Sequence, residues 1–235
     1  MHIPDGFLDP KVSGGLAGAA AVVLGYCFSK VKQAVTAVVP QVALAAAGKG
    51  AHSLAFGSRR VMTKFGESQL MRMAAVASLI FAAQMFNFPI AGGTSGHLIG
   101  GVLAVVLLGP FAGALSIAAV LIVQSLFYAD GGLMALGANI INMAVFGALI
   151  SYYVYFWLSK ILTEWLSVMI AAWLSVILAA LACALEIGLA DTIAFSTVVP
   201  AMIKVHAVIG IAEALITIAL LNLFRQLMPA KDSPQ

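Results

Sequence analysis

The sequence predicts an all-α, polytopic membrane protein with about seven transmembrane helices, formed as a single transmembrane domain over residues 1–235. Hydrophobic residues make up 63% of the chain and charged residues only 9%, against roughly 45–50% and about 25% in ordinary soluble domains. Apolar runs close to the length of about 20 residues that crosses a bilayer recur along the chain. Lipid is therefore expected to be the main solvent of this protein.

Seven apolar segments are expected to form helices, at about residues 12–29, 73–91, 98–109, 111–129, 136–158, 161–189 and 201–224. Only Gly109 and Pro110 separate the third segment from the fourth, and a helix interior disfavours both residue types. We therefore expect this pair to be a tight helical hairpin or one broken helix.

The segment 34–71 is the only long connection, and we expect it to lie in the cytoplasm. It is mildly basic and is interrupted by Pro40 and several glycines, so a short helix at the membrane surface is expected there. Its apolar stretch, 36–48, leaves an eighth span open. That stretch is shorter than a span of about 20 residues, and a span there would invert everything downstream.

The basic residues predict the orientation of the chain. An outer N-terminus and alternating spans leave only Lys11 and Lys204 outside and place ten basic residues in the cytoplasm: Lys30, Lys32, Lys49, Arg59, Arg60, Lys64, Arg72, Lys160, Arg225 and Lys231. This positive-inside bias predicts an outer N-terminus and a cytoplasmic C-terminus. Because the basic residues form no continuous face, no nucleic acid partner is expected.

Several kinds of chemistry have no motif in this sequence. There is no glycine-rich phosphate-binding loop that ends in Gly-Lys-Ser or Gly-Lys-Thr, no His-Glu-x-x-His zinc helix and no run of carboxylates for calcium. Cys27 and Cys183 lie inside apolar runs, where cysteine behaves as a small hydrophobe. We therefore expect no enzymatic activity and no resident cofactor, and the energy for any transport must come from partners or gradients.

His2 is the first candidate metal ligand. The opening residues lack the features of a signal peptide, so we expect Met1 to stay the first residue of the mature protein. The α-amine of Met1, the deprotonated amide of His2 and the His2 imidazole then supply three nitrogens in two fused chelate rings. A fourth nitrogen would complete a square plane, which suits Ni(II) or Cu(II), with Co(II) as a near competitor. The alternative is a terminal tail with a chance histidine.

His97 is the candidate for the fourth nitrogen. It follows the stretch Asn87-Phe88-Pro89-Ile90-Ala91-Gly92-Gly93-Thr94-Ser95-Gly96 and opens a helix on the outer side. The glycines of this stretch allow the backbone to bend into the membrane, and Thr94 or Ser95 is expected to cap the helix or to orient an imidazole. The alternative is a glycine-rich packing turn.

Together these residues resemble one family, the substrate-binding membrane component of nickel and cobalt energy-coupling-factor transporters, of the NikM/CbiM type. The resemblance extends over nearly the whole chain. It rests on Met1-His2-Ile3-Pro4-Asp5-Gly6-Phe7-Leu8, Asn87-Phe88-Pro89, Gly93-Thr94-Ser95-Gly96-His97, Leu108-Gly109-Pro110, Asp130-Gly131-Gly132, Leu136-Gly137-Ala138-Asn139 and His206-Ala207-Val208-Ile209-Gly210 with Glu213. The long connection after the first helix and the cation at Lys204 depart from the family.

The resemblance implies a function, a set of partners and a location in a prokaryotic cell (inner) membrane. The protein would be the substrate-specific component of an ABC-type transporter that takes up Ni²⁺ or Co²⁺, held by the Met1 amine, the His2 amide and imidazole, and His97. The implied partners are two cytoplasmic ATPase subunits, a transmembrane coupling subunit and, in some systems, a small accessory membrane subunit. Because the chain ends at Gln235, we expect that accessory subunit to be separate or missing.

Four further polar residues are candidates for supporting roles. Asp130, in an outer turn with two glycines, is expected to help position the N-terminal loop. Asn139 fits an inter-helix hydrogen bond. His206 and Glu213 are seven residues apart and share one helix face, so they are expected either to pin helices together or to act next to the metal.

Two other functions remain open. Gly93-Thr94-Ser95-Gly96 matches the nucleophile turn of rhomboid-type intramembrane proteases, with His206 as a base, but this reading leaves His2 and His97 unexplained. A gradient-driven metal carrier would differ mainly in needing no partners. The sequence does not decide between nickel and cobalt, since the affinities of one site for the two metals differ modestly.

Overall fold

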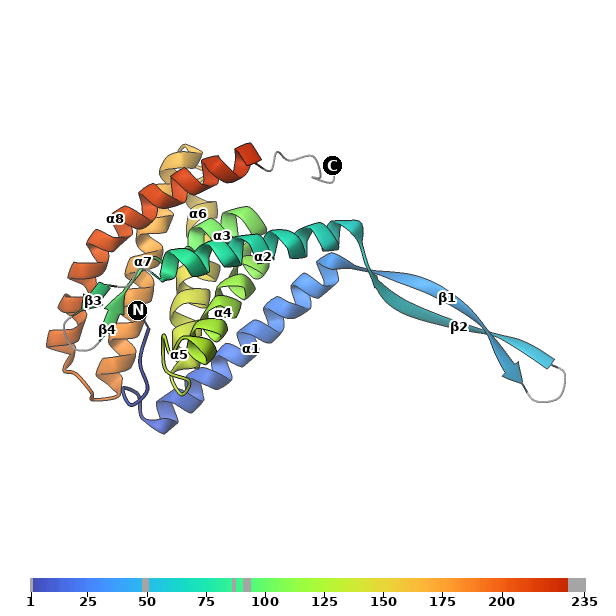
Figure 1. Cartoon of the computed structure of the whole chain (residues 1–235), viewed down its shortest axis with the longest axis horizontal. Coiled ribbons are helices and arrows are strands. Elements are labelled where there is room, and N and C mark those ends of the chain that lie inside the picture. Colours follow the sequence, from blue (N-terminus) through green and yellow to red (C-terminus); the bar gives the residue numbers. More distant parts are fainter. Residues whose placement is uncertain (1, 48–50, 86–87, 91–93, 228–235) are drawn as a thin grey trace.

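The computed structural model describes residues 2–47, 51–85, 88–90 and 94–227, which form a helical bundle with a long β-ribbon projecting from it (Figure 1). The helices are α1 (Pro10–Val35), α2 (Lys64–Gln84), α3 (Gly101–Leu108), α4 (Pro110–Phe127), α5 (Leu136–Ile140), η1 (Ile141–Ile150), α6 (Ser151–Leu158), α7 (Glu164–Leu189) and α8 (Phe195–Leu227). The elements α5, η1 and α6 follow one another without a break over Leu136–Leu158, and η1 is a π-helix. The seven predicted helical segments are therefore all present.

Five helical segments of the described chain are long and apolar enough to cross a membrane: Pro10–Val35, Pro110–Phe127, Leu136–Leu158, Glu164–Leu189 and Phe195–Gln226. Of the other two predicted segments, α3 has only eight residues, and α2 has 21 but is not among the five. The protein is thus a multi-pass membrane protein. Helix α3 packs in the bundle but is too short to cross a membrane by itself.

The connection between α3 and α4 is a tight helical hairpin, one of the two predicted forms. Gly109 adopts φ 83° and ψ 168°, and Pro110 begins α4 directly after it. One turn later, a Cβ added to Gly113 would lie 2.9 Å from the backbone of Ala104. The two helices therefore pack backbone to backbone, which only glycine permits at this position.

The prediction of a short helix in the segment 34–71 is wrong. This segment instead forms an antiparallel ribbon of β1 (Thr36–Ala47) and β2 (Ala51–Met62), with Thr36 opposite Met62, and then the first two turns of α2. β-branched residues at 35, 36, 38 and 39, followed by a proline at 40, favour extended backbone over a helix. An apolar run of this length fits both periodicities, so composition alone did not decide between them.

The helix expected over 73–91 is shifted toward the N-terminus. It starts nine residues earlier, at Lys64, and ends at Gln84. Strand β3 (Phe88–Ile90) follows and pairs antiparallel with β4 (Thr94–Gly96), and the chain then leads into α3. Proline at position 89 lacks the amide hydrogen that a helix would need, so the extended form is favoured.

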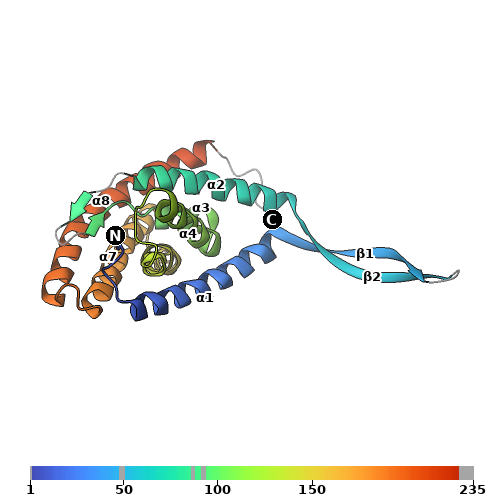
Figure 2. The same cartoon turned by 60° about the horizontal axis from the view of Figure 1, so that its bottom comes forward.

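The connections group at two ends of the bundle (Figure 1). The α6–α7 connection, which contains Lys160, lies at the same end as the C-terminus of α8, where Arg225 pairs with Glu164. The N-terminal segment and the α7–α8 connection lie at the opposite end (Figures 1 and 2). Lys160 and Arg225 therefore share one end of the molecule, as the positive-inside pattern predicts.

The contact between α3 and η1 gives a test of the bundle. A Cβ at Gly101 would lie 2.0 Å from the carbonyl oxygen of Gly147, so Gly101→Ala must push these elements apart. We expect the free energy of unfolding to fall by about 1–3 kcal/mol, the usual cost of overpacking, measured as a lower melting temperature in detergent. Gly15→Ala is the control, because a Cβ there meets nothing within 4 Å. Equal stability of the two variants would contradict this packing.

Candidate metal site

The N-terminal segment folds into the bundle instead of extending from it. Ile3 is fully buried, and its N–H donates to Oδ1 of Asn139 at 2.7 Å. The Ile3 carbonyl accepts from Nδ2 of Asn139 at 3.2 Å and from the N–H of Gly132 at 2.9 Å. Because an unpaired buried peptide group is costly, these bonds fix the backbone that carries His2.

The loop before α5 encloses this segment from the other side. Asp5 accepts two hydrogen bonds, from the N–H of Leu133 at 3.2 Å and from that of Met134 at 2.8 Å. A Cβ on Gly132 would lie 2.1 Å from Oδ1 of Asp5, so only glycine allows this approach. The predicted role of the 130–132 turn in positioning the N-terminal loop therefore has a structural basis.

His2 is buried against this loop, with 4% of its surface exposed. Its Nδ1 lies 2.8 Å from Oδ1 of Asp130, and because a carboxylate only accepts, Nδ1 carries the proton and Nε2 the lone pair. Burial lowers the pKa of His2, although the hydrogen bond to Asp130 opposes the shift. Burial alone would raise the pKa of Asp130, but its bond to His2 brings that pKa below the usual value. A neutral imidazole thus faces an ionised carboxylate at neutral pH.

His97 meets His2 from the connection between β4 and α3. Its side chain is fully buried, and the two imidazole rings stack with centroids 4.5 Å apart and planes inclined by 30°. Nδ1 of His97 donates to the carbonyl of Leu98 at 2.7 Å, so its lone pair also lies on Nε2. Burial lowers the pKa of His97 well below its usual value, and the neighbouring His2 and His206 act in the same direction. The ring is therefore neutral.

Both rings have a nitrogen available for a ligand. Within the described part of the chain, Nε2 of His2 and Nε2 of His97 are buried and have no hydrogen-bond partner. Buried polar atoms are normally paired, so two adjacent exceptions point to a missing ligand. The sequence analysis predicted that these two residues, 95 positions apart, act together. The structure places their rings in contact.

His206 and Glu213 both face this region from α8, but they bond to different groups. Nδ1 of His206 donates to the carbonyl of Met202 at 2.8 Å, and its Nε2 has no partner among the described residues. Glu213 accepts from the N–H of Ile99 at 2.9 Å and from that of Gly100 at 2.7 Å. Glu213 therefore holds the start of α3, which begins at Gly101 with Gly100 as its N-cap residue. The predicted roles of Thr94 or Ser95, to cap this helix or to orient an imidazole, stay predictions.

Three predicted site residues are described only in part or not at all. Met1 lies outside the described residues. Thr94 and Ser95 lie in β4, where the structure describes the backbone but not these side chains. The ligand roles of Met1, His2 and His97 accordingly stay predictions.

Sequence reasoning missed two residues that hold the N-terminal segment. Asp5 is one, and its position between Pro4 and Gly6 is a typical turn signal that could have revealed it. Thr192 is the other, and its hydroxyl donates to the carbonyl of Phe7 from the α7–α8 connection. Nothing in the sequence indicates that second contact, because 185 positions separate the two residues.

Side chains alone do not complete a metal site here. Across residues 2–47, 51–85, 88–90 and 94–227, no cluster of three or more His, Cys, Asp or Glu side chains could hold a metal ion. Two stacked imidazoles leave a divalent metal short of the four ligands that it commonly takes.

Comparison with known proteins gives consistent matches. The CbiM family, described as the cobalt uptake substrate-specific transmembrane region, matches residues 2–230. A protein of Archaeoglobus fulgidus, provisionally named as a fused nickel transport protein, NikMN, is 36% identical over 219 residues, which is 92% of this chain and 63% of that protein. A provisionally named metal transport protein of Haloquadratum walsbyi is also 36% identical over 219 residues, 92% of this chain and 86% of that protein.

Solved structures agree with these sequence matches. The crystal structure of a transition metal transporter matches with a TM-score of 0.79 at 30% identity, covering 97% of this chain and 93% of that one. A truncated transition metal transporter matches with a TM-score of 0.77 at 31% identity, covering 97% and 98%. With its multi-pass fold and its buried histidine pair, the chain belongs to the CbiM family of nickel and cobalt transport proteins.

Proposed function

We propose that this protein is the substrate-binding component of an energy-coupling-factor transporter and that it binds Ni²⁺ or Co²⁺ from outside the cell. The observation that supports this most is the buried N-terminal segment, which stacks His2 on His97, with the bare Nε2 of His97 beside the ring of His2. The family also favours transport over the protease alternative, because the relatives described above are named as metal transport proteins.

The proposed ligands are four nitrogens: the Met1 amine, the His2 amide, the His2 imidazole and the His97 imidazole. Within His2, only Nδ1 can close a six-membered ring with the residue's own amide nitrogen and the metal. That atom is hydrogen-bonded to Asp130 in the structure. Metal capture therefore exchanges the Asp130 bond for the metal and moves the ring proton from Nδ1 to Nε2, while Ile3 stays anchored by Asn139.

The donor set favours nickel. Four nitrogens in one plane suit Ni(II), whereas Cu(II) would bind such a site more tightly still, so selectivity must also depend on which metal is available. A stack of neutral imidazoles adds no charge of its own, and Asp130 supplies a nearby negative charge for the incoming cation. We propose Ni²⁺ as the first substrate and Co²⁺ as the alternative.

We propose that two cytoplasmic ATPase subunits and a transmembrane coupling subunit drive the transport. The coupling subunit would contact the cytoplasmic half of the protein and faces of small residues. In the C-terminal half of α1, which is the cytoplasmic half in the predicted orientation, Gly25 is exposed, and a Cβ added to it would meet nothing within 4 Å in the described chain beyond its own helix backbone. The same is true of Gly14, Gly15 and Gly18 in the outer half, so the face is open to close helix packing along its length.

The N-terminal amine gives the direct test of the chelate. Addition of one residue before Met1, or acetylation of its amine, should abolish tight nickel binding while the apoprotein still folds, because the first change displaces the amine donor and the second removes its basicity. His2→Ala should also abolish tight binding. His52→Ala is the control, since His52 lies in β2, outside the site. Isothermal titration checks this, and full affinity in the extended protein would refute the chelate.

Metal binding should weaken as the pH falls below about 7, because the amine, the amide and the imidazoles must all be deprotonated to bind. The lowered pKa values of His2 and His97 keep these rings neutral to below their usual value of 6.5, so the main loss comes from the amine and the amide. The apoprotein should also lose stability below pH 6.5, where the unfolded chain takes up protons that the buried rings resist. Nickel titrations from about pH 8 to pH 5 check this, and an affinity independent of pH would contradict it.

Energy coupling is testable in vesicles. Vesicles with this chain alone should bind nickel without accumulating it, because the sequence contains no nucleotide-binding loop. Co-reconstitution with the ATPase and coupling subunits should give ATP-dependent uptake of radioactive nickel. Accumulation against a gradient by the chain alone, with ATP depleted, would support the gradient-driven carrier instead.

A further inference from the structure

We propose that Glu213 and Gln84 are positioning residues for His97, acting through the two peptide groups that follow it. We call this pair the peptide clamp. The inference rests on the proposed function, since it assigns these residues to the support of a metal ligand. Its basis is a chain of hydrogen bonds that runs from the His97 ring through one peptide group to a buried carboxylate.

The first peptide group of this chain joins Leu98 to Ile99, and side chains hold both of its ends. Its carbonyl accepts from Nδ1 of His97 at 2.7 Å, and its N–H donates to Oε2 of Glu213 at 2.9 Å. Hydrogen bonds in series polarise one another. Glu213 thus makes the Leu98 carbonyl a stronger acceptor, which fixes the His97 ring and raises the basicity of its Nε2, as a carboxylate does when it bonds directly to a metal-binding histidine.

The second peptide group, from Ile99 to Gly100, is held in the same way. Its carbonyl accepts from Nε2 of Gln84 at 2.7 Å, and its N–H donates to Oε1 of Glu213 at 2.7 Å. Gly100 adopts φ 72°, and a Cβ there would lie 2.7 Å from the side chain of Ile80. This left-handed glycine lets two successive N–H groups converge on one carboxylate.

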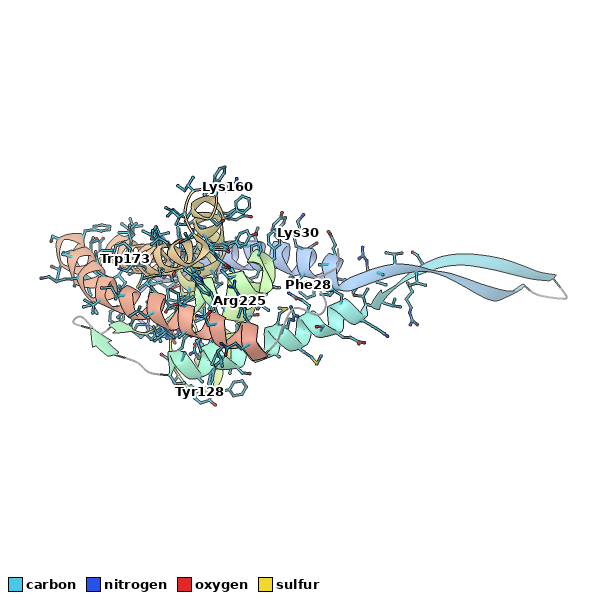
Figure 3. The ribbon with its side chains drawn as sticks, turned by 90° about the horizontal axis from the view of Figure 1, so that it is seen from above. Phe28, Lys30, Tyr128, Lys160, Trp173 and Arg225 are labelled. Carbon is cyan, nitrogen blue, oxygen red and sulfur yellow. The ribbon has the colours of Figure 1, made fainter. Side chains whose placement is uncertain are left out.

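The clamp draws on two helices that are far apart in sequence. Gln84 is the last residue of α2 and is fully buried, whereas Glu213 lies in α8 with 2% of its surface exposed. Residues of α2 and α8 line one cavity with Gly100, and the ribbons of the two helices overlap in the view of Figure 3. A carboxylate buried in a membrane bundle is costly unless it is compensated. Here the two N–H groups and the positive end of α3 stabilise it.

Glu213→Gln tests the clamp, because it keeps the volume of the side chain but replaces one carboxylate oxygen with an NH₂ group. That group is a donor and cannot accept the hydrogen bond of the backbone N–H that faces it. We expect nickel affinity to fall by about tenfold or more, the usual effect of losing a partner that orients a ligand. The d–d absorption of bound nickel should move toward that of His97→Ala. In a His97→Ala background, Glu213→Gln should change the affinity by less than about twofold, since the ligand it positions is already gone. A purely structural residue would weaken both backgrounds equally.

A second variant acts from the other helix and keeps the proposal testable if Glu213→Gln does not fold. Gln84→Leu removes the donor to the Ile99 carbonyl and should weaken binding in the same direction, again without effect in the His97→Ala background. Two matched controls should leave nickel binding unchanged. Gln124→Leu replaces a buried glutamine with no side-chain partner among the described residues. Glu186→Gln replaces a buried carboxylate that accepts from Asn142.

The outcomes separate the clamp from the proposed function. If His97→Ala binds nickel as the unmodified protein does, then His97 is no ligand and the proposed function fails at that residue. If His97→Ala weakens binding but Glu213→Gln and Gln84→Leu bind with full affinity and an unchanged spectrum, the clamp alone is overturned. If the controls weaken binding as much as the clamp variants, the effect is general destabilisation and the clamp is again overturned.

Discussion

The pairing of Ile3 with Asn139 is the contact on which the buried N-terminal segment, and with it the proposed metal site, depends. A chain terminus normally frays in solvent because nothing pairs its peptide groups. Here one asparagine side chain both accepts from the N–H and donates to the carbonyl of the same residue. The side chain of Asn139 thus pairs with Ile3 as the backbone of a neighbouring β-strand would. It holds the backbone beside His2 in the protein interior, where an unpaired peptide group would be costly.

The backbone around His97 follows the same rule. Non-helical backbone inside a membrane protein is tolerated only where neighbouring groups satisfy it. The residues between β4 and α3 meet this condition with side chains from α2 and α8, not with a cap from their own sequence. A single buried carboxylate therefore satisfies the start of a helix and at the same time holds the peptide that orients an imidazole. Glu213 thus has both a structural role at the start of α3 and the proposed role of positioning His97.

The two stacked histidines form a buried pair that is neutral. Burial keeps both rings uncharged, and Nδ1 of each ring is bonded to a partner while its Nε2 is bare. In the proposed site a cation would meet the lone pair of His97 directly, would exchange with Asp130 for Nδ1 of His2, and would find the charge of Asp130 nearby. The proposed remaining ligands are the Met1 amine and the His2 amide.

Several features of this protein could be predicted from the sequence. The apolar runs determined the helices because lipid leaves the chain no other way to pair its peptide groups, and Gly109-Pro110 determined a hairpin because neither residue suits a helix interior. The family followed from local motifs, and the family match over residues 2–230 confirms it. The same motifs pointed to His2 and His97, which the structure brings into contact.

Other features were decided only by the tertiary structure. The ribbon after α1 did not follow from hydrophobic periodicity, because an apolar run of this length fits a helix and a strand, although its β-branched residues and Pro40 favour the extended form. The partners of the site were also beyond reach, since Asp5 and Glu213 bond to backbone groups that lie 128 and 114 positions away. Which N–H meets which carboxylate depends on how the helices pack, and a one-dimensional pattern contains no information about that.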